Sequence, residues 1–175
     1  IIRTALVTGS GRNIGRARAR AIARQGCNVV VNGSTNLAAC ESVAGEVEDL
    51  GAQALVAMGD VGDHQAAREI CRAGATGFGR IDVLVNNAAI FPRSPMLEMA
   101  EDEWDAVIGV NLKGSFLCAQ AAAKRMVAAG RSGSIVSLAS RAAFCSSPRG
   151  VHYVTSKSGI VGMTRAMALE LAPHN

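Results

Sequence analysis

Short apolar runs alternate along the chain with longer amphipathic segments. The runs rich in Val, Ile, Leu and Ala predict five buried strands, at residues 4–9, 28–33, 53–61, 81–89 and 133–140. The segments between and after them have helical spacing and predict helices at 14–25, 37–50, 64–76, 101–129 and 152–171. Gly51 and Pro173 mark helix ends, and Gly109 suggests a bend inside the longest helix.

This order of elements predicts the fold class. Strands that are continuously apolar and alternate with helices are typical of a parallel sheet covered on both faces. Right-handed crossovers then give a doubly wound α/β architecture, the Rossmann fold. We find no internal repeat or linker, so we expect residues 1–175 to form one dinucleotide-binding domain. Because the last predicted helix has no strand after it, we expect this domain to be incomplete at its C-terminus.

Composition narrows the class of protein. With 175 residues, 49% of them apolar, the chain can bury a sizeable core, which argues against disorder. The net charge of +4 favours anionic ligands. Four arginines, at 16, 18, 20 and 24, fall in one predicted helix without interleaved aromatic residues. We interpret them as a solvated helix face and expect no nucleic-acid partner.

Cysteine and histidine positions bear on compartment and metals. The five cysteines, at 27, 40, 71, 118 and 145, form no CxxC pair, which favours reduced thiols and a cytoplasmic location. The three histidines are far apart and lack ligand spacing, so we expect no metal site. No apolar run approaches the ~20 residues of a membrane span, so we expect no membrane partner.

The stretch TGSGRNIG, Thr8–Gly15, joins the first predicted strand to the first predicted helix. In a doubly wound sheet this turn holds a dinucleotide pyrophosphate, because glycines admit the phosphates and the helix N-terminus faces their charge. The same turn occurs in methyltransferases and flavoproteins, and glycines can also serve turn geometry alone. The motif by itself therefore leaves the kind of nucleotide open.

The end of the second predicted strand separates two nicotinamide cofactors. An NAD site usually has Asp or Glu there, bonded to the ribose 2′-hydroxyl. Here the strand ends in Asn32, Gly33 and Ser34, so no carboxylate repels a 2′-phosphate. Arg12 in the glycine loop could reach that phosphate, although it could equally be a solvent-facing charge. These features favour NADP(H), with NAD(H) possible.

Tyr153 and Lys157 form the first candidate for chemistry. Positions i and i+4 share one helix face, and an ammonium close to a phenol favours the phenolate. Such a phenol can give or take a proton near neutral pH. Ser140 is expected to end the fifth strand, and Asn111 lies inside the longest helix, where asparagine is a poor helix former. Each has a structural explanation by itself, but together they indicate an active site.

The chain resembles the short-chain dehydrogenase/reductase family over nearly all of its length. Thr8–Gly15 resembles the family's TGxxxGxG loop, Asp60–Val61 its adenine-contacting pair, and NNAA at 86–89 its NNAG. Four residues align with its catalytic tetrad: Asn111, Ser140, Tyr153 and Lys157.

Two positions depart from the family's pattern. Asn13 replaces the middle glycine of the loop and must tolerate its tight turn, which Asn does better than most residues. Ala89 replaces the last glycine of NNAG.

The resemblance implies reversible hydride transfer between a nicotinamide and a carbonyl or secondary alcohol. It implies that Tyr153 donates the proton, Ser140 orients the substrate oxygen, Lys157 favours the phenolate and holds the ribose, and Asn111 positions a water. It also implies the cofactor-binding set Gly9, Ser10, Arg12, Asn13, Ile14, Gly15, Asn32, Ser34, Asp60, Val61, Asn87, Ala88, Ala89, Tyr153 and Lys157.

Substrate and assembly are less determined. The pattern is similar to 3-oxoacyl-acyl-carrier-protein reductases and to sugar or polyol dehydrogenases. Arg141 and Arg149 could meet an anionic substrate group or could be surface charge. Family members form homodimers or homotetramers through the long helix and the helix that carries the tyrosine, and the Ala-rich face at 119–129 fits such pairing. The alternatives are a nucleotide-binding module without turnover, if the chain ends near residue 175, and a methyltransferase.

Overall fold

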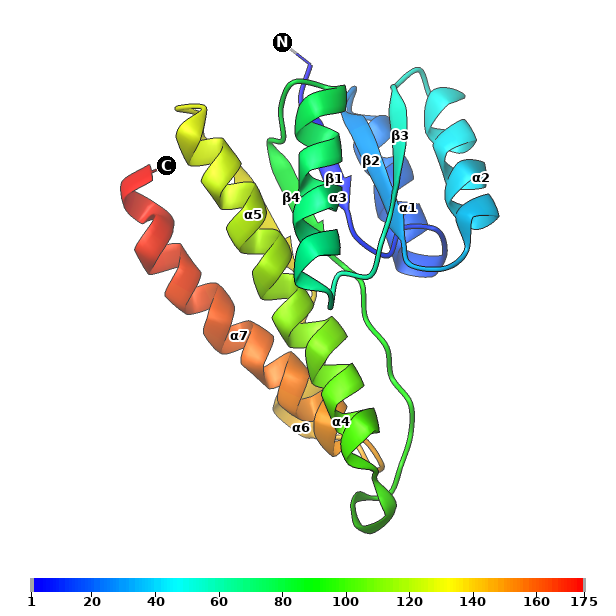
Figure 1. Ribbon diagram of the computed structural model, residues 1–175, viewed down its shortest axis with the longest axis vertical. Helices are drawn as coiled ribbons and strands as arrows, with labels where there is room; N and C mark the ends of the chain where they lie inside the picture. Colours follow the sequence, from blue (N-terminus) through cyan, green and yellow to red (C-terminus); the bar gives the residue numbers. More distant parts are fainter. Residues whose placement is uncertain (1, 175) are drawn as a thin grey trace.

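Five parallel strands form one sheet in the computed structural model, which describes residues 2–174. The strands are β1 (Thr4–Val7), β2 (Asn28–Gly33), β3 (Ala54–Met58), β4 (Val83–Asn86) and β5 (Ser134–Ser137). Their spatial order is β3-β2-β1-β4-β5, with every neighbouring pair parallel (Figure 1). The predicted doubly wound α/β class is confirmed, and all five predicted strands are present, although β1, β3, β4 and β5 are shorter than expected.

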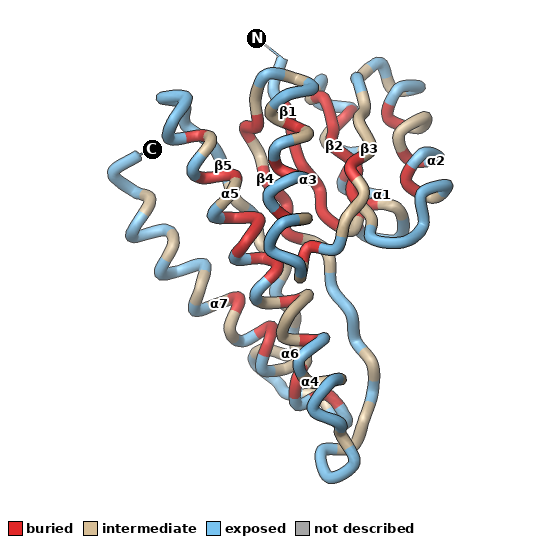
Figure 2. Tube along the Cα trace, viewed as in Figure 1, coloured by how far each residue is buried: buried red, intermediate tan, exposed pale blue. Residues whose placement is uncertain are grey.

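Alternating strand residues supply the two halves of the core. Leu6, Val30 and Leu84 belong to one buried cluster, together with residues of α3 (His64–Gly77) and α5 (Gly114–Ala128). Their neighbours Val7, Val31 and Val85 belong to a second cluster, with residues of α1 (Asn13–Ala23) and α2 (Leu37–Glu48). Successive strand side chains point to opposite faces, so each face is covered by its own pair of helices. Figure 2 shows the central strands β1 and β2 buried along nearly their whole length, whereas β5 at the edge of the sheet is not buried.

Side-chain caps explain where two of these helices begin. Oδ1 of Asn36 accepts the N–H of Ala39 at 2.9 Å, and Oδ1 of Asp63 accepts the N–H of Ala66 at 2.7 Å. Each cap satisfies one of the N–H groups that lack a partner in the first turn. Both starts, at Leu37 and His64, agree with those predicted.

The longest helix is continuous from α4 (Glu101–Ile108) through a π-helical turn, η2 (Gly109–Lys113), into α5. The irregularity expected near Gly109 is therefore this π turn. By length and composition this segment, Glu101–Ala128, could span a membrane, and it is the one such helix within residues 2–174. Half of the apolar stretch of this helix is buried inside the fold. Its residues also belong to the core cluster around α3, as expected of a core helix.

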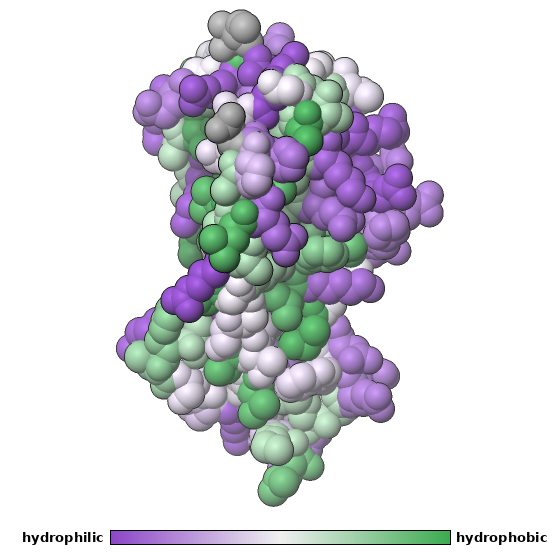
Figure 3. Space-filling view, turned by 90° about the vertical axis from the view of Figure 1, so that its left-hand side faces the viewer, coloured by the Kyte–Doolittle hydropathy of each residue, from purple (hydrophilic) through white to green (hydrophobic). Residues whose placement is uncertain are grey.

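The last long helix, α7 (Val151–Leu171), runs beside α5 at the β5 edge of the sheet (Figure 1). Three short helices were not predicted: η1 (Met96–Glu98), α6 (Ala142–Cys145) and η3 (Ala172–His174). Large apolar side chains are exposed on β5 and α7, with Val136 45% and Leu169 79% accessible. Figure 3, which views the molecule from the left-hand side of Figure 1, shows apolar surface scattered along the height of this face.

Candidate active site

The loop between β1 and α1 approaches the end of β4 so closely that two positions require glycine. Gly9 has φ +60, and a Cβ there would lie 2.8 Å from Cα of Ala88. A Cβ on Gly15 would lie 2.6 Å from Nδ2 of Asn87. Asn13 has φ +49, so the expectation that it adopts the tight left-handed turn is confirmed. The result is a backbone cradle at the N-terminus of α1 that no side chain fills.

Thr8 and Asn87 hold this loop against β4. Nδ2 of Asn87 donates to the carbonyls of Thr8 and Gly9 at 2.9 and 3.0 Å. Oγ1 of Thr8 accepts the N–H groups of Asn87 and Ala88 at 2.9 and 3.0 Å. Thr8 was not among the predicted site residues, although it stands in the TG pair that begins the motif. Both side chains shape the cradle from behind.

The side chains of Ser10 and Asn32 also make their hydrogen bonds within the protein. Ser10 is completely buried, and its Oγ donates to the carbonyl of Val7 at 2.8 Å and accepts the N–H of Asn32 at 3.0 Å. Nδ2 of Asn32 donates to the carbonyl of Ala57 at 2.9 Å, and its Oδ1 accepts the N–H of Gly9 at 3.1 Å. The structure therefore places the Ser10 side chain below the loop, outside the cleft. Asn32 lines the cleft with an amide whose hydrogen bonds are already made.

A cleft of about 680 Å³ opens over the cradle at the carboxyl ends of the strands. Twelve predicted cofactor residues line it: Gly9, Arg12, Asn13, Ile14, Gly15, Asn32, Ser34, Asp60, Val61, Asn87, Ala88 and Ala89. Ser10, Tyr153 and Lys157 do not line it. Residues that were not predicted also line it, among them Gly11, Thr35, Asn36, Cys40 and Ile90. Its size lies within the ~300–1,000 Å³ usual for ligand pockets.

Two charged residues of the cleft have distinct surroundings. Arg12 is exposed and precedes the first residue of α1, where its backbone is extended. Oδ1 of Asp60, just after β3, accepts the N–H of Gly62 at 2.8 Å, which shapes the turn into α3. The residues that follow β2 carry no carboxylate. An anionic group of a ligand could therefore approach Arg12 without being repelled by a carboxylate at the end of β2.

Lys157 is buried, with 4% of the residue accessible. Its Nζ donates to the carbonyl of Leu138 at 2.7 Å, which ties α7 to the end of β5. Burial lowers the pKa of Lys157, because the charged form loses hydration. Nζ also lies over the ring of Tyr153, 5.8 Å from its centroid. The predicted lysine–tyrosine contact is thus present in the structure.

The ring of Tyr153 stacks on Phe91, with centroids 3.9 Å apart and an angle of 22° between the planes. The guanidinium of Arg93 lies 5.0 Å from the centroid of the Phe91 ring. Gly150 makes room for this stack, since a Cβ there would lie 2.9 Å from the Phe91 ring. Phe91 was not predicted, and a residue that matters through a stacking contact from a loop leaves no periodic signal.

Asn111 is fully buried in the π turn. Its Oδ1 accepts the N–H of Ile90 at 2.8 Å, and its Nδ2 donates to the carbonyl of Ile90 at 3.0 Å and to Oγ of Ser156 at 3.2 Å. Oγ of Ser156 in turn donates to the carbonyl of Tyr153 at 2.8 Å. The Asn111 side chain thereby joins the loop after β4 to the helix that carries Tyr153.

Ser140 lies in the loop that follows β5, since the strand ends at Ser137. The expectation that Ser140 ends the strand is therefore wrong. Its Oγ accepts the N–H of Ala142 at 3.1 Å, at the start of α6, and α6 packs against α7. Tertiary pairing with β4 stops at Asn86, so the apolar continuation of the sequence does not extend the strand.

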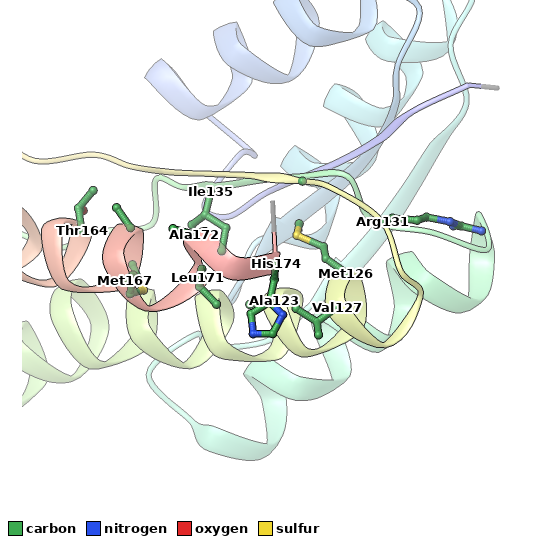
Figure 4. Close-up of a pocket in the computed structure, with 12 residues that line it drawn as sticks. Ala123, Met126, Val127, Arg131, Ile135, Thr164, Met167, Leu171, Ala172 and His174 are labelled. Carbon is green, nitrogen blue, oxygen red and sulfur yellow. The ribbon is translucent and has the colours of Figure 1, made fainter.

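A second cavity, of about 240 Å³, lies between α5, α7 and the amino end of β5. Figure 4 shows Met126, Met167 and Leu171 among its largely apolar lining, with His174 in η3, just after α7. It contains none of the predicted site residues. In parallel sheets ligands bind at the carboxyl ends of the strands. We therefore assign the candidate active site to the cleft and the Tyr153 region.

No group of three or more His, Cys, Asp or Glu side chains suited to a metal ion occurs within residues 2–174. The five cysteines are all free thiols.

A glycine cradle at the N-terminus of α1, at the carboxyl edge of a parallel sheet, defines the class as nucleotide-binding proteins of the doubly wound fold. The family model described as short chain dehydrogenase matches residues 3–175, and the chain belongs to this family. It is similar to the 3-oxoacyl-[acyl-carrier-protein] reductase FabG of Staphylococcus aureus, with 38% identity over 97% of this chain and 69% of that protein.

Two further relatives show the range of the family. The L-rhamnose 1-dehydrogenase (NAD(P)(+)) of Azotobacter vinelandii is 36% identical, with 99% of this chain and 69% of that protein covered. The crystal structure of acetoin dehydrogenase from Enterobacter cloacae superposes with a TM-score of 0.94 at 34% identity, over 99% of this chain and 69% of that one. The curated relatives are longer than this chain, which spans 69% of their length.

Proposed function

We propose that this protein transfers a hydride between NADP(H) and a carbonyl or secondary alcohol substrate. One observation carries the proposal: Tyr153, the single tyrosine of the chain, lies against buried Lys157 on the helix that borders the end of β5. The glycine cradle supplies a site for the cofactor pyrophosphate at the N-terminus of α1. A structural role for Lys157 alone would not require burying an ammonium group.

The bound cofactor supplies the hydride, and the chain supplies the proton and the orientation. In the reducing direction the Tyr153 hydroxyl gives its proton to the substrate oxygen as that oxygen gains negative charge. Ser140 donates a hydrogen bond to the same oxygen and orients it. The Lys157 ammonium stabilises the phenolate that remains and holds the nicotinamide ribose. Asn111 holds the helix of Tyr153 in place and positions a water that links Lys157 to solvent.

Arg12 and the end of β2 support NADP(H) as the preferred cofactor. A 2′-phosphate carries up to two negative charges, and a guanidinium can bind it through two parallel hydrogen bonds. Arg12 and Ser34 are both exposed residues that line the cleft. The carboxylate that would repel the phosphate is absent from the end of β2. NAD(H) is the second candidate.

The substrate class is a 3-oxoacyl thioester or a sugar or polyol. One of the named relatives is described as a 3-oxoacyl-[acyl-carrier-protein] reductase, and another as an L-rhamnose 1-dehydrogenase. Arg93, Arg141 and Arg149 are exposed, and Arg93 lies over the Phe91 ring that stacks on Tyr153; these arginines could bind an anionic part of the substrate. We place the protein in the cytoplasm on the basis of its five free thiols.

We also propose that the protein forms a homodimer or homotetramer through α5 and α7. Phe116 and Val127 on α5 are 43% and 39% exposed, and Leu169 on α7 is 79% exposed. Exposed large apolar residues on two neighbouring helices are more frequent at interfaces than on free surfaces. Light scattering of the whole protein measures the mass of the assembly directly.

The test is a cofactor-oxidation assay against a panel of 3-oxoacyl thioesters, ketoses and small ketones, with NADPH and NADH in parallel. We expect turnover with at least one carbonyl and a higher kcat/KM with NADPH. Tyr153→Phe is expected to lower kcat by at least ~100-fold, since it removes the proton donor. Cofactor binding, followed by NADPH fluorescence, is expected to stay near the wild-type value.

Thr155→Val is the matched control, because it removes an exposed hydroxyl from the same helix. A Tyr153→Phe protein with near wild-type kcat would contradict the proton-donor role. Cofactor binding without turnover of any carbonyl would favour the alternative of a nucleotide-binding module.

A further inference from the structure

His152 makes two contacts that the proposed chemistry does not use. Its side chain is completely buried, and Nε2 lies 3.0 Å from Oε1 of Glu103 in the first turn of α4. Its Nδ1 accepts the backbone N–H of Tyr153 at 2.7 Å. The residue next to the proposed proton donor therefore connects that donor's backbone to another helix.

These contacts determine where the imidazole carries its proton. In neutral imidazole one ring nitrogen donates and the other accepts. Because Nδ1 accepts a backbone N–H, Nε2 carries the hydrogen and donates it to the Glu103 carboxylate. A second proton on Nδ1 would face the N–H of Tyr153 and the positive end of α7. The geometry thus fits the neutral Nε2–H form of His152.

The beginning of α7 explains why such a contact matters. The helix starts at Val151, and the preceding residue, Gly150, has no side chain to cap it. The N–H groups of a first helical turn have no partner within the helix. His152 supplies the acceptor for the N–H of Tyr153, so the turn that carries the phenol is held by a side chain from within the turn.

The carbonyl of Tyr153 is held in a parallel way. It accepts Oγ of Ser156 at 2.8 Å, and that oxygen accepts Nδ2 of Asn111 at 3.2 Å. Asn111 lies in the π turn that continues α4 without interruption. Both peptide groups beside Cα of Tyr153 are therefore tied to one helical unit, through Glu103 at its start and Asn111 farther along.

We propose that His152 and Glu103 are positioning residues, which fix the direction in which α7 presents the Tyr153 ring to the substrate. The inference rests on the proposed function, since it names what orients the proposed proton donor. Neither residue touches the glycine cradle. The pair should therefore affect the chemical step and leave cofactor binding unchanged.

Two of the three carboxylates in the first turn of α4 allow a matched comparison. Glu103→Ala and Glu101→Ala each remove one acidic residue from the helix start, but only Glu103 contacts His152. A displacement of ~1 Å at a reacting group can cost ~100-fold in rate. In the whole protein we expect Glu103→Ala to lower kcat by ~10-fold or more at unchanged KM for the cofactor. Glu101→Ala should keep the wild-type kcat, and equal kcat values in the two variants would overturn the proposal.

Variants at His152 separate positioning from folding. His152→Asn keeps an acceptor near the place of Nδ1, and His152→Gln keeps a donor near the place of Nε2. We expect both to retain more kcat than His152→Ala, and Glu103→Gln to retain more than Glu103→Ala because it keeps an acceptor. If the kcat of these variants followed only their melting temperatures, with no rescue, the pair would be merely structural and the proposal wrong.

Two measurements do not depend on turnover. The ¹⁵N chemical shifts of the imidazoles report tautomers, and the His152 signals are those lost in His152→Asn; we expect the neutral Nε2–H form. Hydrogen exchange in residues 150–157 should be faster in Glu103→Ala and unchanged in Glu101→Ala. An Nδ1–H tautomer or equal exchange in both variants would refute the tether. If the wild type reduced no carbonyl, the proposed function would fail while these measurements still tested the tether.

Discussion

At the scale of single residues, burial of the Lys157 ammonium is unfavourable for stability, whereas the proposed chemistry depends on this group. Its ammonium lies in the interior, with the Leu138 carbonyl as its hydrogen-bond partner. A charged group loses hydration on burial, and only part of this loss is recovered by one hydrogen bond. The burial of Lys157 therefore costs stability, and the proposed function supplies a reason for that cost. The same tension does not affect Arg12, whose guanidinium remains in solvent.

Lys157→Met tests the burial of the ammonium through pH. The lowered pKa of folded Lys157 means that the folded state releases this proton before the unfolded chain does. Stability therefore rises with pH between that lowered pKa and 10.5, the ordinary value. We expect Lys157→Met to lack this rise, as measured by urea unfolding from neutral to alkaline pH. Lys124→Met, at an exposed position, should keep it; a rise that persists in Lys157→Met would contradict the assignment.

Arg12→Ala tests the preference for NADP(H). Removal of the guanidinium should raise the Kd for NADPH by ~10- to 150-fold, since a charge-assisted contact contributes about 1.5–3 kcal/mol. The Kd for NADH, which has no 2′-phosphate, should change little. Fluorescence titration measures both values, with Arg18→Ala, at an exposed position of α1, as the control. Equal losses for the two cofactors would assign Arg12 to the pyrophosphate or to surface charge.

At the scale of elements, the loop and helix at residues 8–23 need left-handed backbone at a position where Asn13 replaces the family's glycine. The loop needs left-handed backbone at Gly9 and Asn13, with φ of +60 and +49. Asn visits this region more readily than other residues with a side chain. The unit can therefore retain its cradle although its middle glycine is replaced.

Asn13→Val and Asn13→Gly measure that demand. A β-branched residue at positive φ is strained, so Asn13→Val should lower the free energy of unfolding by about 1–2 kcal/mol. Asn13→Gly should be neutral or slightly stabilising. Urea unfolding of both is compared with Arg18→Val, which carries only the helix-propensity cost of valine on α1. If Asn13→Val were no worse than Arg18→Val, the left-handed turn would not be a constraint.

The π turn at Gly109–Lys113 is an element that local periodicity does not predict. Its i→i+5 bonding disrupts the helical repeat, and π turns often occur at functional sites. Here it accommodates Asn111, whose amide bonds Ile90 and Ser156 from two distant segments. A sequence with a strong helical pattern on both sides predicts only one long helix, because the reason for the turn lies in contacts 21 and 45 residues away.

At the scale of the whole molecule, Asp82 connects the strands at the amino end of the sheet. Its Oδ2 accepts the N–H of Thr4 at 2.8 Å, from 78 residues away, and both oxygens accept Arg80 at 2.7 and 2.5 Å. Its backbone carbonyl accepts the N–H of Ser134 at 2.9 Å. Burial alone would raise the pKa of Asp82, but the hydrogen bonds from Arg80 and Thr4 hold it below 3.8.

Asp82→Asn should therefore destabilise the whole sheet. We expect a loss of about 1–3 kcal/mol at neutral pH, since a hydrogen-bonded carboxylate is replaced at a buried site. The carboxylate stabilises fully above the ordinary pKa of 3.8, and its contribution is lost as the pH falls through the lowered folded value. The difference from wild type should shrink over that acidic range in thermal unfolding. Asp49→Asn, an exposed change of the same kind, should show no such pH dependence.

Local pattern was enough for the order of strands and helices, the parallel sheet, and the glycine loop at the start of α1. The i,i+4 spacing of Tyr153 and Lys157 also predicted a contact that the structure contains. These features depend on residues a few positions apart, where helical and strand geometry determine which side chains meet. The short helices η1 and α6 and the early end of β5 at Ser137 escaped prediction, because strand length depends on pairing with β4.

The sequence by itself determined the order of the elements and, except for Ser140, which lies beyond the end of β5, where the candidate residues for the chemistry stand. Tertiary structure decided which polar side chains are free to do it. The Ser10 hydroxyl accepts the N–H of Asn32 in β2, and Nδ2 of Asn32 donates to the carbonyl of Ala57 in β3, so both side chains bind segments that they meet only after folding. His152 has no motif, yet it joins Tyr153 to Glu103, 49 residues away. A buried polar group must find a partner, and that partner is set by the packing of distant segments.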